Sequence, residues 1–362
     1  MTQKLATAEW ADPDQFAEKN AYSTGRFWLG RSPVSGQPLG YDDDRHVCLV
    51  SGSRSGKGTT TIIPNLCLWP GSVVVVDPKG ENATITAARR GPGSEHCEGL
   101  GQTVHVLDPF GVAKVDDALR SRFNPLDAID PASSRAIDEA GSLADAIVVI
   151  SPDAKEPFWD ESARSLIKTL ILHVLTSPLF KGKRNLVTVR QLITRGDHEG
   201  VEILRKKGKD RLPTGQELLW YGVSKNEHYN GVIAGFGQSM RDMLKSSPKQ
   251  VNSVVQIANR NTEFLDSPDK QRCVEASDFQ LTDLKTDPKG VSIFLSLPPQ
   301  YMGEHFRWLR MMVTLTVFQM QAHSSQPVSG HRVLMCLDEF AGLEHMKIIE
   351  TAVAQIAGFG VK

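Results

Sequence analysis

One short segment restricts the fold of this chain more than any other: residues 51–59, which read SGSRSGKGT. The run before it, residues 46–50, is apolar and predicts a buried parallel strand. From Thr59 onwards, the sequence TTTII can open a helix. A strand, a glycine-rich loop and a helix in this order are the context that a phosphate-binding loop requires. An ordinary glycine turn is the alternative, and the two flanking elements disfavour it.

In such a loop, backbone N–H groups turn towards phosphate oxygens, because glycine tolerates the backbone angles that this requires. The amino end of the following helix adds a positive partial charge. We expect Lys57 to reach the β- and γ-phosphates of a nucleotide. The residues predicted to bind the nucleotide through this loop are Gly52, Ser53, Arg54, Ser55, Gly56, Lys57, Gly58 and Thr59.

The loop departs from the general pattern G-x-x-x-x-G-K-[ST] at two positions. Ser51 stands at the first glycine position, with Gly52 beside it, and Gly58 stands where a Ser or Thr hydroxyl normally binds Mg²⁺. We therefore expect Thr59, or alternatively Thr60, to supply the hydroxyl for Mg²⁺. Unchanged magnesium dependence after substitution of each threonine would refute this hypothesis.

A second apolar run, residues 333–337, ends in Asp338 and Glu339. A carboxylate at the carboxyl end of a parallel strand faces the ligand crevice of an open α/β sheet. We expect Asp338 to hold Mg²⁺ directly or through water, and Glu339 to orient or deprotonate the attacking water. Lys57, Asp338 and Glu339 are thus the predicted catalytic residues. Without the glycine loop, a strand that simply ends in solvent would be the better interpretation.

A third apolar run, residues 71–76, is followed by Asp77 and Pro78. The run predicts a fully buried strand, and the proline stops it. We interpret Asp77 as a residue of the nucleotide site, ranked below Asp338 and Glu339. A capped turn is an equally good interpretation of the same carboxylate.

The predicted elements change along the chain. Residues 1–44 predict a short hairpin around a turn-rich centre. Residues 45–135 and 281–362 alternate strands and helices, which predicts one α/β nucleotide-binding domain built from two parts of the sequence. Residues 136–280 have helical periodicity and predict an inserted all-helical domain.

Composition limits the function classes. The chain has 362 residues and 40% hydrophobic content, enough for one large α/β domain and a smaller one. With 41 basic and 42 acidic side chains, it is not expected to coat DNA through a strongly basic surface, although a ring can concentrate positive charge in its pore. The five cysteines form no Cys-x-x-Cys pair, which argues against a zinc site and a disulfide framework. No signal peptide and no apolar stretch of about 18 residues is visible, so we expect a cytoplasmic chain without a transmembrane segment.

Several segments along the chain resemble the type IV secretion coupling proteins of the VirD4 and TraG group. The segments that carry the resemblance are LGY at 39–41, RSGKG at 54–58, IP at 63–64, DPKGE at 77–81, FNPL at 123–126, FWDESA at 158–163, RWLR at 307–310 and DEF at 338–340. The glycine after Lys57, unusual in a general phosphate loop, is common in this group, so this departure supports the resemblance.

The resemblance implies a RecA-like P-loop NTPase domain with an inserted all-α domain, and ATP and Mg²⁺ as cofactors. It implies a homo-hexameric ring at the cytoplasmic face of the inner membrane. Such a ring passes single- or double-stranded DNA, a relaxase or effector cargo to the channel proteins of a type IV secretion system. Members usually carry N-terminal membrane helices and continue past the region that resembles this chain. We therefore expect the chain to lack the membrane anchor and the C-terminal end of the motor domain.

The leading hypothesis is an ATP-driven coupling protein for type IV secretion or conjugation. Two alternatives are a DNA translocase of a non-secretion system with the same motor fold, and a nucleotide-binding cargo adaptor that does not hydrolyse ATP. In a ring, an arginine from the next subunit would complete the site, and Arg307 and Arg310 are candidates by elimination. Basic clusters at residues 181–184 and 205–209 either contact DNA phosphates or, more simply, form solvated surface.

Overall fold

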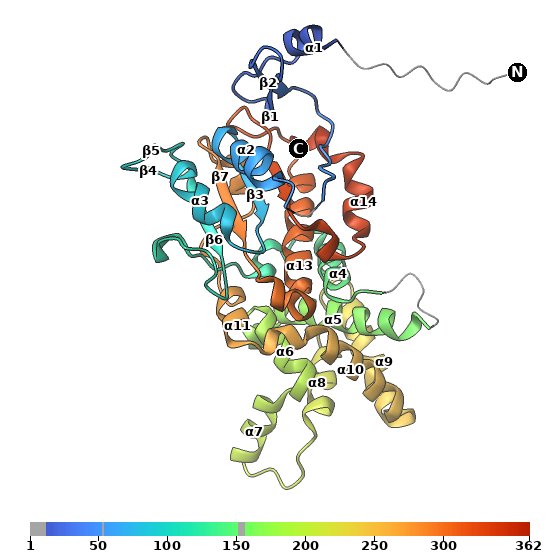
Figure 1. Ribbon diagram of the computed structural model, residues 1–362. Helices are drawn as coiled ribbons and strands as arrows, with labels where there is room; N and C mark the ends of the chain where they lie inside the picture. The colour runs from blue at the N-terminus through green and yellow to red at the C-terminus, as the bar shows by residue number, and fades with distance from the viewer. Residues whose placement is uncertain (1–11, 53, 151–155) are drawn as a thin grey trace, which may run out of the picture.

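A parallel sheet of four strands forms the centre of the structure (Figure 1). The computed structural model describes residues 12–52, 54–150 and 156–362. The strands of the sheet are β3 (Val73–Val76), β6 (Thr103–Leu107), β7 (Val291–Leu295) and β8 (Leu334–Leu337). They lie in the order β6-β7-β3-β8, so strands from distant parts of the sequence pair directly. The predicted parallel α/β sheet built from two parts of the chain is confirmed.

Both faces of the sheet are covered, because successive side chains of a strand point to opposite sides. Val73 and Val75 belong to a buried cluster with apolar residues of α2 (Ile63–Leu68) and α3 (Glu81–Arg90). Val74 and Val76 belong to a second cluster, with residues of α4 (Ala136–Ile147) and α13 (Met302–Ala322). All four valines are buried, which explains the uninterrupted apolar sequence of β3.

The chain between β6 and β7 is mainly helical. After α4 its helices are α5 (Phe158–Thr176), α6 (Leu186–Arg195), α7 (His198–Lys206), α8 (Gly215–Val223), α9 (Val232–Ser246), α10 (Pro248–Thr262), α11 (Pro268–Val274) and α12 (Asp283–Thr286). In Figure 1, α7 lies at the end of the molecule that is opposite the N-terminal hairpin. The predicted change from strands to helices in this part of the sequence is therefore present.

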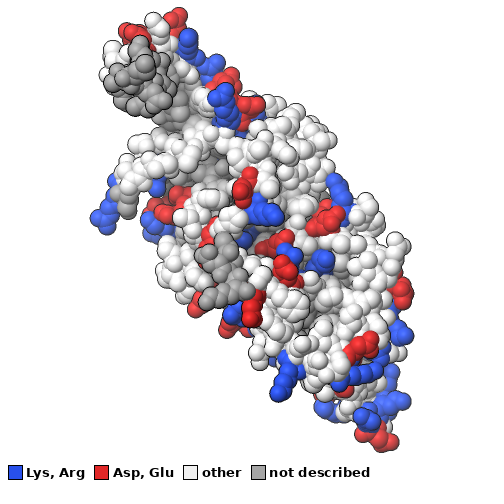
Figure 2. Space-filling view, turned by 90° about the vertical axis from the view of Figure 1, so that its right-hand side faces the viewer, with Lys and Arg blue, Asp and Glu red and all other residues white. Residues whose placement is uncertain are grey.

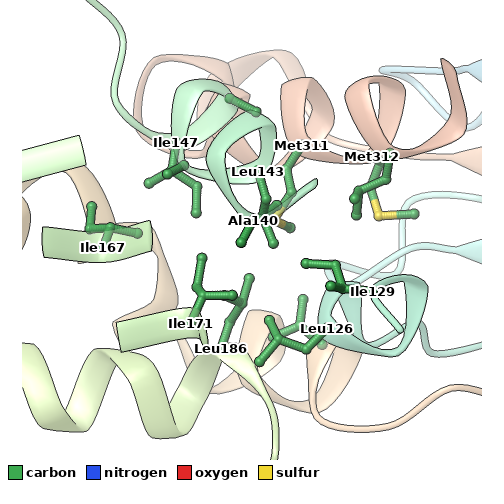
Figure 3. Packing of buried hydrophobic residues seen from close by; sticks show 14 of the residues in the cluster. Leu126, Ile129, Ala140, Leu143, Ile147, Ile167, Ile171, Leu186, Met311 and Met312 are labelled. Atoms are coloured by element: carbon green, nitrogen blue, oxygen red, sulfur yellow. The ribbon is translucent and has the colours of Figure 1, made fainter. Parts of the chain in front are cut away.

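The core is continuous from the sheet into the helical part (Figure 3). Leu143 of α4, Ile171 of α5 and Met311 of α13 are fully or almost fully buried in the same cluster. These helices have apolar residues at helical spacing, and each turns its apolar side towards the others. One core spans both the nucleotide-binding part and the helical part 136–280. The predicted division into residues 1–44, a two-part nucleotide-binding domain (45–135 and 281–362) and an inserted domain (136–280) therefore stays a prediction.

Two short antiparallel ladders complete the strands. The predicted N-terminal hairpin is formed by β1 (Phe27–Arg31) and β2 (Pro38–Tyr41), after the short helix α1 (Pro13–Lys19). Asn65 of α2 holds this hairpin, because its side chain accepts from Trp28 N at 2.7 Å and donates to Trp28 O at 3.0 Å. The second ladder joins β4 (Gly93–Ser94) and β5 (Cys97–Glu98).

The predicted strand at residues 46–50 is wrong. These residues belong to no strand, and Val50 is 90% exposed. The outer edge of β8 is instead occupied by residues 360–362, where the N–H of Met335 donates to Lys362 O at 2.9 Å. Residues 46–50 therefore have no free strand edge beside them, and an apolar sequence alone cannot bury them.

Across the ranges that the structure describes, no helix is both long enough and apolar enough to cross a bilayer.

Candidate nucleotide-binding site

The three predicted catalytic residues line one cavity. Lys57, Asp338 and Glu339 all contribute to the wall of a cavity of about 610 Å³. Most of the remaining lining residues are apolar, and half of them come from residues 46–49, from β8 and from α14 (Lys347–Val353). The cavity reaches the carboxyl end of β8, the position at which open α/β sheets bind ligands. The fold thus brings together two motifs from opposite parts of the sequence.

The phosphate loop is shaped by local interactions. The Ser55 hydroxyl donates to Gly52 O at 2.7 Å, within the loop itself. Arg54 and Gly56 have φ angles of 60° and 88°, in the left-handed region that glycine tolerates and arginine rarely adopts. The described residues before Gly56 are exposed, so the loop backbone is open to a ligand. Ser53, also predicted to bind the nucleotide, lies outside the described residues.

The helix after the loop begins with a wide turn. Gly58–Ile62 forms a π turn that continues directly into α2, with Lys57 at its amino end. Turns of this type occur frequently at functional sites. The first N–H groups of such a helix have no intrahelical partner, and they lie next to the predicted phosphate-binding residues. The predicted order of glycine loop and helix is confirmed.

The two threonine hydroxyls considered for Mg²⁺ point back into the loop. Thr59 Oγ1 and Thr60 Oγ1 both donate to Gly56 O, at 3.2 and 2.8 Å. Both residues are exposed, and each oxygen keeps lone pairs for a metal ion. Within the described part of the chain, the cavity wall includes Thr61 but neither of these two. Thr61 was not predicted, although its place in the run of three threonines was a signal for it.

We name residues 338–346 the acidic loop. Its first residue, Asp338, accepts a hydrogen bond from the N–H of Glu339 at 3.0 Å. Glu339 has φ 53° and ψ 37°, a left-handed conformation that turns the chain sharply after β8. Positions with such backbone strain cluster at active sites and switch regions.

Asp77 lies beside Asp338, because Val76 and Leu337 are register partners at the ends of β3 and β8. Its carboxylate is buried and accepts from the N–H of Asn82 at 3.2 Å and of Ala83 at 2.8 Å. Burial raises the pKa of Asp77 to about 6, against the effect of these hydrogen bonds, and the charge of Asp338 adds to the rise. Asp77 therefore caps the first turn of α3, as the alternative interpretation expected, and its part in the nucleotide site stays a prediction.

The groups around the cavity form a suitable set for a nucleoside triphosphate with a divalent cation. Lys57 supplies a positive charge for phosphate oxygens, and the phosphate loop before it supplies backbone N–H groups and hydroxyls. Asp338 and Glu339 supply the oxygen ligands that Mg²⁺ prefers.

The chain matches one known protein family over almost its whole length. The family described as "Type IV secretory system Conjugative DNA transfer" matches residues 3–362. The chain belongs to this family. The conjugal transfer protein TraG of Escherichia coli is 27% identical over 332 residues, which are 90% of this chain and 48% of TraG. The coupling protein VirD4 of Bartonella quintana is 25% identical over 85% of this chain and 43% of VirD4. The chain thus spans about half the length of these curated relatives.

Solved structures of another coupling protein have the same fold. TrwBΔN70 with sulphate is 14% identical with a TM-score of 0.63, covering 97% of this chain and 69% of that one. TrwB in complex with ADP and Mg²⁺ is 14% identical with a TM-score of 0.61, covering 96% and 69%. This member of the conjugative DNA transfer family therefore has the RecA-like P-loop NTPase fold.

In this family member, Arg310 is not placed as an arginine finger. Its side chain is buried, and Nη1 donates to Leu343 O at 2.6 Å and to His345 O at 2.8 Å. Arg307 is partly buried and donates from Nε to Ile147 O at 3.1 Å. A finger must reach the site of a neighbouring subunit. Both arginines are instead bonded to carbonyls of their own chain, which disfavours the buried Arg310 as a finger, whereas Arg307 stays a prediction.

Charges on the surface of this family member are mixed. Figure 2 shows Lys and Arg side chains interspersed with Asp and Glu over the displayed face. Within the two basic clusters, Lys183 forms an ion pair with Glu199, and Arg205 forms one with Glu202. These pairings favour the interpretation of both clusters as solvated surface.

Proposed function

We propose that this chain supplies the ATP-binding and ATP-hydrolysing part of a coupling protein. The protein would use ATP to move DNA, a relaxase–DNA complex or protein cargo towards a type IV secretion channel. The observation that carries the proposal is the single cavity lined by Lys57, Asp338 and Glu339 at the carboxyl end of β8. Membership of the conjugative DNA transfer family favours this function over that of a non-secretion translocase.

Each residue has a distinct part in the proposed reaction. Lys57 and the N–H groups of the phosphate loop hold the triphosphate, and Lys57 stabilises the charge that develops on it. Asp338 would hold Mg²⁺, together with a hydroxyl of Thr59 or Thr60. The ion would neutralise phosphate charge. Glu339 orients a water molecule and accepts its proton as the water attacks.

The proposed assembly follows the relatives. TraG and VirD4 are named for conjugal transfer and for coupling to type IV secretion, and TrwB has been solved with an ATP analogue and with ADP and Mg²⁺. We infer a homo-hexamer at the cytoplasmic face of the inner membrane, in contact with DNA, cargo and channel proteins. Sedimentation with and without nucleotide tests the ring. A chain that stays monomeric at micromolar concentration in both states would contradict it.

A second candidate function is a nucleotide-binding cargo adaptor without hydrolysis. It is favoured by residues 46–50, which precede the phosphate loop but are unpaired and largely exposed. A phosphate loop that is not fixed to the sheet can bind a nucleotide and still fail to align it with Glu339.

ATP turnover with and without single-stranded DNA separates the two candidates, with Lys57→Ala as the site variant. We expect DNA-stimulated turnover that the substitution abolishes. Binding of ATP without turnover, again lost in Lys57→Ala, would support the adaptor. Binding that survives the substitution would contradict both functions at this site.

A further inference from the structure

The acidic loop is connected to the helical part of the molecule through one buried side chain. Arg310 of α13 donates from Nη1 to Leu343 O at 2.6 Å and to His345 O at 2.8 Å. The same guanidinium donates from Nε to Ala146 O at 3.3 Å, in the last turn of α4. The last carbonyls of a helix lack intrahelical partners, so this contact also caps α4.

The two loop carbonyls that Arg310 binds flank a strained residue. Glu344 has φ 57° and ψ −168°, close to a region of backbone angles that is essentially restricted to glycine. Such a conformation persists only where the surroundings hold the chain on both sides. Arg310 does so through Leu343 and His345, and Leu343 is itself fully buried.

The strain and the contact lie a few residues beyond the predicted catalytic carboxylates. Glu339, at the other end of the same short loop, also has a left-handed backbone. Only three residues separate Glu339 from Leu343, the first of the two loop residues whose carbonyls Arg310 binds. In the same last turn, α4 is joined to α5 by the ion pair of Asp145 with Arg164 at 2.9 Å.

We propose that Arg310 is a positioning residue that ties the acidic loop to the carboxyl end of α4, so that the nucleotide state of the site reaches the helical region. The nucleotide dependence in this inference rests on the proposed function. The hydrogen bonds that join the acidic loop to α4 through Arg310 do not depend on that function. Among the described residues, the hydrogen bonds of Arg310 go to backbone carbonyls and not to Asp338 or Glu339, so it acts through the loop backbone.

Arg307 provides a matched control. It lies one turn away on α13 and donates to Ile147 O at 3.1 Å, so it also caps α4. Among the hydrogen bonds of the described residues, it has none to the acidic loop. Substitution of Arg307 therefore weakens the cap of α4 and removes no hydrogen bond of the acidic loop, whereas substitution of Arg310 affects both. The charges of both arginines interact with Glu344, so the loss of one positive charge near the loop is the same in the two variants.

Amide hydrogen exchange of the full chain tests the tie without nucleotide. We expect Arg310→Gln to accelerate exchange about tenfold both in the acidic loop and in the last turn of α4. Arg307→Gln should accelerate exchange in α4 alone. Acceleration in only one of the two places in Arg310→Gln would overturn the proposal. Should Arg310→Gln fail to fold, Arg310→Lys keeps the charge but cannot bridge three carbonyls, and the same pattern is expected.

The same exchange experiment with a non-hydrolysable ATP analogue and Mg²⁺ tests whether the nucleotide state reaches α4. In the native chain we expect slower exchange in the phosphate loop, the acidic loop and the last turn of α4. In Arg310→Gln the slowing should remain in the phosphate loop and disappear in α4, whereas Arg307→Gln should retain it in both. Slowing in the phosphate loop of the native chain without a response in α4 refutes the transmission. No slowing in the phosphate loop refutes the proposed function instead.

Discussion

The phosphate loop and the acidic loop face the same cavity, but the fold supports them differently. The acidic loop follows a strand that pairs with β3 on one side and with residues 360–362 on the other. Arg310 then fixes its backbone from the core side. The phosphate loop follows residues 46–50, which no strand supports.

The phosphate loop is held in place through α2, the helix that follows it. Arg90 of α3 is completely buried and donates to Leu66 O at 3.0 Å and to Gly71 O at 2.6 Å, at the far end of α2. The carboxylates are thus positioned by sheet pairing, whereas Lys57 is positioned by α2 and by the hydrogen bonds of Arg90 at the end of that helix. This difference in support can be tested by substitution on both sides of the cavity.

The first prediction concerns Glu339 of the acidic loop. Glu339→Gln should lower ATP turnover about 1,000-fold, because it removes the group that accepts the proton of the attacking water. The affinity of this variant for a non-hydrolysable ATP analogue should stay within about threefold of the native value. Steady-state turnover and equilibrium binding measure the two quantities. A comparable loss of affinity would mean that Glu339 holds the nucleotide and does not act on water.

The second prediction concerns the anchor of the phosphate side. Arg90→Met should lower the free energy of unfolding by about 3–5 kcal/mol, because it leaves several buried acceptors unpaired. Arg89→Met is the matched control, since Arg89 is only partly buried and donates to Cys67 O and Glu98 O. The control should lose about 1 kcal/mol in denaturant unfolding. Equal losses would show that burial of the network around Arg90 is unimportant.

The third prediction compares one residue type in two apolar runs. Val75→Ala in β3 should cost about 2–3 kcal/mol of unfolding free energy, because Val75 is fully buried between the sheet and α3. Val50→Ala should change it by less than about 0.5 kcal/mol, since Val50 is 90% exposed. Urea denaturation of both variants measures the difference. A loss of more than about 1 kcal/mol in Val50→Ala would place residues 46–50 in the core after all.

The fourth prediction uses the pair of acids at the sheet edge. The charge of Asp338 contributes to the raised pKa of Asp77, which is about 6. Above pH 6 Asp77 is ionised and is repelled by the charge of Asp338, so Asp338→Asn should raise the unfolding free energy by about 0.5 kcal/mol at pH 7.

This gain should vanish as the pH falls through 6, because Asp77 then becomes neutral and the repulsion ends. Thermal or urea unfolding of the native chain and the variant at pH 5 and pH 7 gives the two differences. A gain at pH 5 as large as that at pH 7 would mean that the effect comes from packing and not from charge.

Part of this structure could be predicted from local sequence. The buried strand β3, the N-terminal hairpin and the helix after the phosphate loop all have patterns that depend on near neighbours. The catalytic candidates Lys57, Asp338 and Glu339 could be predicted because each adjoins such an element, and the fold brings all three to one cavity.

Other features could not be predicted, because they depend on contacts between distant residues. Residues 46–50 have the composition of a strand, but pairing needs a free edge, and residues 360–362 occupy the edge of β8. Arg307 and Arg310 were equivalent in the sequence as candidate fingers. Only the positions of Leu343 O and Ala146 O reveal that Arg310 binds its own chain and bridges two elements.

Short motifs with local physical causes were enough to predict the fold class, the family and the three residues of the proposed chemistry. The tertiary structure alone decided which apolar run joins the sheet, that Asp77 caps a helix and that Arg310 joins the acidic loop to α4. A hydrogen bond between residues far apart in the chain depends on where the packed core places both partners, and local sequence does not encode that position.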